Sequence, residues 1–209
     1  MNNVHIIEHP FIQERLHVLR SVKTNTAQFR AAVIECGELF SYEIARSYKT
    51  KTVTVKTPLE ETASQVLKTH VTIVAILRAA LGLVEGLCRY LPHARIGHMG
   101  LYRNEDTLKP VQYYCKLPSD MDEGYIILAD PMLATGGSLV ATLDELSEFT
   151  SMKSLSIATL IAAPEGIKKV GAKYPNVPIY TAAVDRTLNE KGYILPGLGD
   201  AGDRQYGTI

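Results

Sequence analysis

One strand-to-helix stretch has the residue types and the spacing that phosphate binding needs. The apolar segment 125–129 ends at the carboxylate of Asp130, and the Thr-Gly-Gly-Ser run 135–138 follows within a short loop. A loop that leads into a helix offers unpaired backbone N–H groups, and two hydroxyls complete a cradle for an anion. The glycines let the backbone approach that anion closely. The stretch predicts a phosphate site, and the alternative is a tight turn capped by Asp130.

Asp130 itself points to a second kind of ligand group. A carboxylate repels phosphate, but it accepts hydrogen bonds from hydroxyls such as those of a ribose. Ligands of open α/β sheets bind at the carboxyl ends of strands, where this residue is expected. Sugar hydroxyls beside a phosphate cradle indicate a phosphorylated ribose.

The rest of the pattern predicts the elements that position this loop. Short apolar runs alternate with helical segments, which indicates an α/β fold with a parallel sheet covered by helices on both faces. The expected strands and helices alternate as 71–77, 78–90, 125–129, 136–149, 155–162, 164–173 and 177–184. The segment 100–117 has no clear helical pattern and suggests a hairpin-like excursion.

Two helices are expected before the first of these strands. One follows Pro10, and a longer one begins near Asn25, which forms a capping-box pattern with Gln28. No repeat, flexible linker or long charge run divides the chain. We therefore expect a single domain over residues 1–209.

Composition excludes several classes of protein. The chain has 209 residues, 46% of them hydrophobic, which is too apolar for a disordered protein. Lys plus Arg and Asp plus Glu both total 22, so the net charge of zero argues against charge-driven nucleic-acid binding. The apolar run 73–77 is too short to span a membrane, and the N-terminus lacks a secretory pattern. Three widely spaced cysteines favour reduced thiols in the cytoplasm.

Two strings match known motifs but lack their context. His5 to His9 matches H-x-x-E-H, yet Pro10 disfavours the helix that would bring both histidines together, so a surface segment at a frayed terminus is expected. Gly197 to Gly202 matches G-x-G-x-x-G, but Pro196 precedes it and the chain ends shortly afterwards. Neither string predicts a zinc or a dinucleotide site.

Four ordered segments resemble those of the uracil phosphoribosyltransferase family, a branch of the type I phosphoribosyltransferases. They span nearly the whole chain and comprise 76–82, 99–105, 130–138 and 192–203. The family has glycine where this chain has Ala80, and an alanine would cost affinity if that backbone needed a positive φ.

The resemblance implies a role for each matching residue. The residues implied to bind 5-phospho-α-D-ribose 1-diphosphate (PRPP) are Arg78, Arg103, Asp130, Pro131, Met132, Leu133, Ala134, Thr135, Gly136, Gly137, Ser138 and Asp200. The residues implied to bind uracil, mostly through their main chain, are Tyr193, Ile194, Gly199, Asp200 and Ala201, within a segment 185–209. Arg103 and Asp200 would act electrostatically on the reaction. Mg²⁺ would be held mainly by substrate and water near Asp200.

The resemblance thus implies a pyrimidine-salvage enzyme that makes UMP and diphosphate from uracil and PRPP. It also implies a homodimer, or a homotetramer activated by GTP. One alternative of the same fold is an RNA-binding regulator of a pyrimidine operon, although no nucleic-acid or membrane partner is expected. The other alternative is a phosphoribosyltransferase for a different base.

Overall fold

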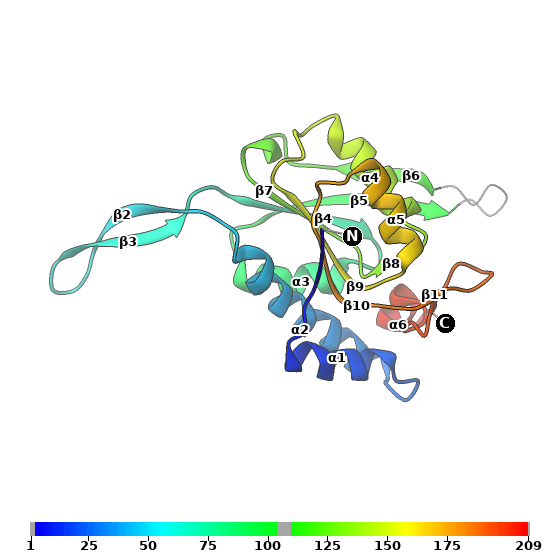
Figure 1. The fold of residues 1–209 in the computed structure, drawn as a ribbon. Coiled ribbons are helices and arrows are strands. Elements are labelled where there is room, and N and C mark those ends of the chain that lie inside the picture. Colours follow the sequence, from blue (N-terminus) through cyan, green and yellow to red (C-terminus); the bar gives the residue numbers. More distant parts are fainter. Residues whose placement is uncertain (1–2, 104–109, 209) are drawn as a thin grey trace.

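The computed structural model describes residues 3–103 and 110–208. A central eight-stranded sheet has the order β1-β10-β9-β7-β4-β5-β6, with β8 paired to β9 (Figure 1). Its strands are β1 (Val4–Ile6), β4 (Val71–Leu77), β5 (Arg95–Arg103), β6 (Pro110–Lys116), β7 (Tyr125–Ala129), β8 (Met132–Leu133), β9 (Leu155–Ala162) and β10 (Ile179–Val184). Only β6 runs antiparallel to its neighbour, so the sheet is mostly parallel, as predicted.

The middle of this sheet is almost entirely buried because both faces are covered. Every residue of β9 is buried, as are four of the five residues of β7. The predicted strand limits 71–77, 125–129 and 155–162 agree with the structure. Buried, mainly apolar runs of this length are typical of parallel strands that have helices on both sides.

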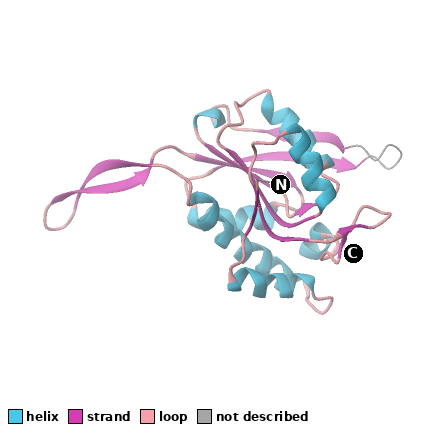
Figure 2. Cartoon of the chain, in the orientation of Figure 1, coloured by secondary structure: helices cyan, strands magenta, loops and turns pink. Residues whose placement is uncertain are grey.

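Helices cover the two faces as separate groups (Figure 2). The larger apolar cluster contains residues of α1 (Pro10–Arg20), α2 (Thr26–Ala45) and α3 (Leu81–Tyr90). A second cluster, on the other face, contains residues of α4 (Gly137–Ser147) and α5 (Pro164–Lys173). The capping box predicted for Asn25 and Gln28 is present at the start of α2.

Two features of the N-terminal third differ from the sequence analysis. A hairpin of β2 (Thr50–Lys56) and β3 (Glu61–Leu67), which was not predicted, projects from the body of the molecule (Figure 1). The expectation of a frayed terminus is wrong from Val4 onward, because β1 pairs with β10 in parallel. His5 therefore lies in a strand while His9 caps α1, which is incompatible with a helical H-x-x-E-H site.

The C-terminal part of the chain lies beside the sheet. It contains β11 (Thr187–Leu188), β12 (Ile194–Leu195) and the short helix α6 (Ala201–Tyr206). Elsewhere in the chain, the 3₁₀ turn η1 (Met121–Glu123) directly precedes β7. The hairpin predicted within 100–117 is confirmed as β5 and β6, although residues 104–109 lie outside the described part. Among the described residues, no helix is long and apolar enough to cross a bilayer.

Candidate active site

A cavity of about 460 Å³ lies where two adjacent parallel strands, β4 and β7, end. Ala79 follows the first of these strands and Asp130 follows the second, and both residues line the cavity. The other lining residues come from two segments, which we call the sheet loop (130–138) and the C-terminal loop (191–202). The carboxyl ends of parallel strands are where ligands of this architecture bind.

The sheet loop turns into α4 at a glycine. Gly136 has a φ of 73°, and a Cβ there would lie 3.0 Å from the carbonyl oxygen of Gly166. Oγ1 of Thr135 accepts the N–H of Gly137 at 3.4 Å, and both residues line the cavity with Ser138. The first turn of an 11-residue helix therefore borders the cavity. Such a turn binds anions through its backbone N–H groups.

Asp130 is nearly buried beside this turn, with 9% of its surface exposed. Its Oδ1 accepts the N–H of Met132 at 3.2 Å, which closes a local turn at the start of the sheet loop. The helix α4 itself begins after Gly136, without a side-chain cap. Burial raises the pKa of the Asp130 carboxyl to about 7, and the hydrogen bond from Met132 opposes this shift. Hydroxyl donors on a ligand would favour the charged form and lower this pKa.

Not every residue of the sheet loop faces the cavity. The carbonyl of Pro131 accepts the N–H groups of Leu160 and Ile161, at 3.0 and 3.2 Å, and Leu133 is fully buried in the core. Met132 and Ala134, in contrast, line the cavity. Pro131 and Leu133 therefore connect the loop to β9 and the core, and they do not border the ligand space.

Arg78 lies next to the cavity, with its guanidinium directed at α6. Its Nη2 lies 3.7 Å from Oδ1 of Asp203, and its guanidinium carbon lies 5.9 Å from the ring centre of Tyr206. The side chain is 57% exposed, so it has room to turn toward an anion. Ala80 has a φ of −75° and caps α3. The backbone there has no positive φ, and alanine causes no strain.

Arg103 is the last residue of β5 and pairs with Pro110. It lies on the hairpin predicted within 100–117, in a strand whose register with β6 shifts between Gly100 and Leu101. Its side chain lies outside the described part of the structure. Its relation to the cavity therefore stays a prediction.

The C-terminal loop supplies the other wall of the cavity. The residues predicted to read the base all line it, namely Tyr193, Ile194, Gly199, Asp200 and Ala201. Asp200 also caps α6, where its Oδ1 accepts the N–H of Asp203 at 2.9 Å. Tyr193 is held by Asn189, whose side-chain oxygen accepts the Tyr193 N–H at 2.9 Å.

Sequence reasoning missed several residues around the site. Lys191 and Gly192 line the cavity, and the buried Gln205 donates from Nε2 to the carbonyls of Ala79 and Ala201 at 2.8 and 3.0 Å. Gln205 thereby links the turn after β4 to the C-terminal loop. No periodicity signals such a contact, because its partners are brought together only by the fold.

The architecture has solved counterparts. A hypoxanthine-guanine phosphoribosyltransferase from Bacillus anthracis superposes with a TM-score of 0.51 at 15% identity, covering 74% of this chain and 78% of that one. A mostly parallel sheet flanked by helices is thus shared with type I phosphoribosyltransferases. The fold class of the chain is that of the type I phosphoribosyltransferases.

Closer relatives specify the branch. The family model for uracil phosphoribosyltransferase matches residues 6–208. Proteins named uracil phosphoribosyltransferase from Finegoldia magna and Bacillus licheniformis are 50% and 49% identical to this chain, and each alignment covers 100% of both chains. The AQ2163 protein from Aquifex aeolicus superposes with a TM-score of 0.92 at 36% identity, covering 97% of each chain. The chain belongs to the uracil phosphoribosyltransferase family, and so to the pentosyltransferases of pyrimidine salvage.

Proposed function

We propose that the cavity is the active site in which the 5-phosphoribosyl group of PRPP is transferred to uracil, giving UMP and diphosphate. The observation that supports this most is that two segments resembling those of the family line the same cavity. The sheet loop and the C-terminal loop are distant in sequence, and both border the same 460 Å³ cavity. The sheet loop has a carboxylate and a helix-start turn that suit a phosphorylated ribose. The C-terminal loop lines the cavity with several glycines, so its main chain is accessible to a base.

For PRPP, we propose that the turn at residues 135–138 holds the 5-phosphate and that Asp130 accepts from the ribose hydroxyls. The remaining members of the sheet loop shape this turn. Arg78 and Arg103 would contact the diphosphate, which leaves with dense negative charge. Arginine suits this role because its planar fork matches phosphate geometry and stays charged.

For uracil, we propose that the main chain at Ile194, Gly199 and Ala201 reads the edge of the base, with Tyr193 and Asp200 beside it. Gly199 has a φ of 81° and carries no side chain to obstruct a ring. Backbone N–H and C=O groups can meet the alternating acceptors and donor of uracil. Residues 185–209 would then be the base-binding segment of one domain that spans 1–209.

The reaction needs no protein nucleophile under this proposal. The ribose carbon gains oxocarbenium character as diphosphate leaves, so catalysis rests on positioning and on charge stabilisation by Arg103 and Asp200. Asp130 would hold the ribose while the C-terminal loop holds the attacking nitrogen of the base. The two loops therefore align the reactants.

We also propose that Mg²⁺ accompanies PRPP. Within the described residues no group of three or more His, Cys, Asp or Glu side chains could form a protein cage. The exposed carboxylate of Asp200 borders the cavity, which fits an ion held by substrate oxygens, water and one protein oxygen. Bound there, Mg²⁺ would neutralise part of the diphosphate charge.

The assembly and setting of the enzyme are further parts of the proposal. We expect a cytoplasmic homodimer, or a homotetramer with GTP as activator. Sedimentation of the purified chain with and without GTP tests the assembly. Assays of UMP formation in the same two conditions test activation.

A nucleobase panel tests the proposed reaction. The purified chain with PRPP and Mg²⁺ should release diphosphate with uracil and give UMP, while the other bases give little product. Preference for a different base would contradict the uracil assignment. Tight filter binding of uridine-rich RNA, without UMP formation, would favour the regulator instead.

A further inference from the structure

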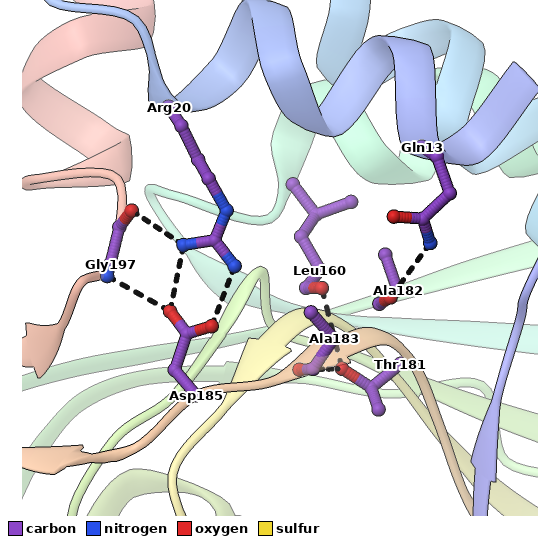
Figure 3. Close-up of polar contacts among 8 residues, drawn as sticks. All are labelled: Gln13, Arg20, Leu160, Thr181, Ala182, Ala183, Asp185 and Gly197. Atoms are coloured by element: carbon purple, nitrogen blue, oxygen red, sulfur yellow. Dashed lines mark hydrogen bonds and ion pairs between the residues drawn. The ribbon is translucent and has the colours of Figure 1, made fainter.

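An ion pair outside the cavity holds the middle of the C-terminal loop (Figure 3). Arg20 ends α1, and its Nη1 and Nη2 donate to Oδ2 and Oδ1 of Asp185 at 2.8 and 2.6 Å. The same Nη1 donates to the carbonyl of Gly197 at 2.9 Å, and the N–H of Gly197 donates to Oδ2 of Asp185 at 2.9 Å. Both polar backbone groups of Gly197 are therefore held by one ion pair.

This ion pair is well placed to fix the loop. Asp185 is 7% exposed and directly follows β10, a strand of the central sheet. Two parallel contacts between a guanidinium and a carboxylate are strong and have a defined orientation. The loop is thus tied both to the sheet, through Asp185, and to α1, through Arg20.

Gly197 is a position where the loop tolerates little change. Its φ is 65°, and a Cβ there would lie 2.1 Å from the carbonyl oxygen of Ile194. It lies between Ile194 and Gly199, two of the positions proposed to read the base. A displacement of this turn would therefore move both positions relative to the ribose.

A second arginine fixes the next residue to the same end of α1. Arg204 donates to the carbonyl of Leu198 at 2.7 Å and to that of Ser21 at 2.6 Å, and it also contacts the carbonyl of Leu19. The C-terminal loop thus packs against the end of α1 through these contacts. Neither Arg20 nor Asp185 lines the cavity.

We propose that Arg20 and Asp185 are positioning residues for the base, acting through Gly197 on the backbone that meets uracil. This rests on the proposed role of the C-terminal loop. The ion pair sets the distance between base and ribose, so its loss should weaken the use of uracil far more than the binding of PRPP. It should also lower the preference for uracil over cytosine.

The test compares three variants of the whole chain by steady-state kinetics with each substrate varied in turn. Arg20→Ala should raise KM for uracil by about tenfold or more and change KM for PRPP by less than about twofold. Arg20→Lys restores the charge without the forked geometry and should fall between the wild type and Arg20→Ala. A rise of both KM values together would overturn the proposal.

Arg15→Ala is the matched control on the same helix. Arg15 pairs with Glu35 at 2.7 Å, and its side chain is 27% exposed, against 26% for Arg20. We expect Arg15→Ala to leave both KM values within about twofold of the wild type. If Arg15→Ala alters KM for uracil as much as Arg20→Ala does, the effect is general destabilisation and the proposal is wrong.

Asp185→Asn provides a second route if Arg20→Ala does not fold. It keeps an oxygen for the N–H of Gly197 but removes the charge that orients Arg20, and the same selective rise in KM for uracil is expected. An unchanged KM for uracil in Asp185→Asn would overturn the proposal. A wild type that forms no UMP would instead contradict the proposed function.

Discussion

The sheet loop and the C-terminal loop border one cavity but are held in different ways. The sheet loop follows β7, which is paired on both sides with parallel strands, so main-chain hydrogen bonds of the sheet position it. The C-terminal loop contains only a two-residue strand, β12, and is held by side chains from other elements, chiefly Arg20 of α1. Arg30 of α2 also holds α6, which follows the loop, by donating twice to the carbonyl of Gln205, at 2.7 and 3.1 Å.

This difference has a consequence for how each loop responds to substitution. A loop positioned by a buried sheet is displaced only by changes that disturb the sheet or the turn itself. A loop positioned by side chains is sensitive to single substitutions far from the cavity, because one guanidinium can carry several of its contacts. Changes that act on one loop and leave the other intact therefore test this contrast.

The largest effect should be the choice between bases, which tests the C-terminal loop. Cytosine presents an acceptor and a donor where uracil presents a donor and an acceptor, so a backbone arranged for uracil would face unpaired, desolvated groups. Such mismatches discriminate by about 10⁴-fold. The measurement is kcat/KM for both bases at saturating PRPP. A ratio below about tenfold, or ~1.4 kcal/mol, would contradict main-chain reading.

Removal of Arg103 should have the next largest effect. If its guanidinium stabilises the leaving diphosphate, Arg103→Ala should lower kcat/KM by about 10²-fold or more. Arg95→Ala is the control, because Arg95 begins the same strand and pairs with Asp120. A loss below about threefold in Arg103→Ala, under ~1 kcal/mol, would remove the assigned role.

A side chain at the start of α4 should affect the sheet loop alone. Gly137→Val should block close approach of the phosphate and raise KM for PRPP by about tenfold or more. Gly171→Val, in α5, meets open space and controls for the cost of valine in a helix. If KM for PRPP were equal in the two variants, the turn would not be the phosphate cradle.

The smallest effect concerns the dependence of stability on pH. Burial raises the pKa of Asp130 to about 7, so between about pH 4 and pH 7 the folded protein keeps a proton that the unfolded chain has lost. Stability contributed by this group therefore falls as pH rises through that window. The upper limit of this loss in the free energy of unfolding is about 4 kcal/mol, and contact of the carboxyl with water should reduce the loss to ~1–2 kcal/mol.

Urea unfolding at pH 5 and pH 8 measures this contribution. Asp130→Asn, which cannot ionise, should lose less stability than the wild type between the two pH values. The difference between the two proteins isolates the carboxyl from other titrating groups. If the wild type and Asp130→Asn lost the same free energy of unfolding between pH 5 and pH 8, Asp130 would not be held in its neutral form.

Much of the fold could be predicted because its signals are local. β4, β7 and β9 are mainly apolar runs with the predicted limits. Asn25 and Gln28 form a cap that two residue types three positions apart can indicate. The hairpin β2–β3 was missed for a physical reason. Most of its residues are exposed, so it has no buried face to impose an alternating pattern.

The two loops divide in the same way between sequence and tertiary structure. The sheet loop could be predicted from the sequence, because a buried strand, a carboxylate, a glycine turn and a helix start are contiguous and each follows from local preferences. The position of the C-terminal loop depends instead on contacts between distant parts of the chain. Arg20 and Asp185 are 165 residues apart, and no local property of either residue indicates its partner. Their contact exists because α1 packs against β10 in the folded protein, which places the end of the helix beside the end of the strand.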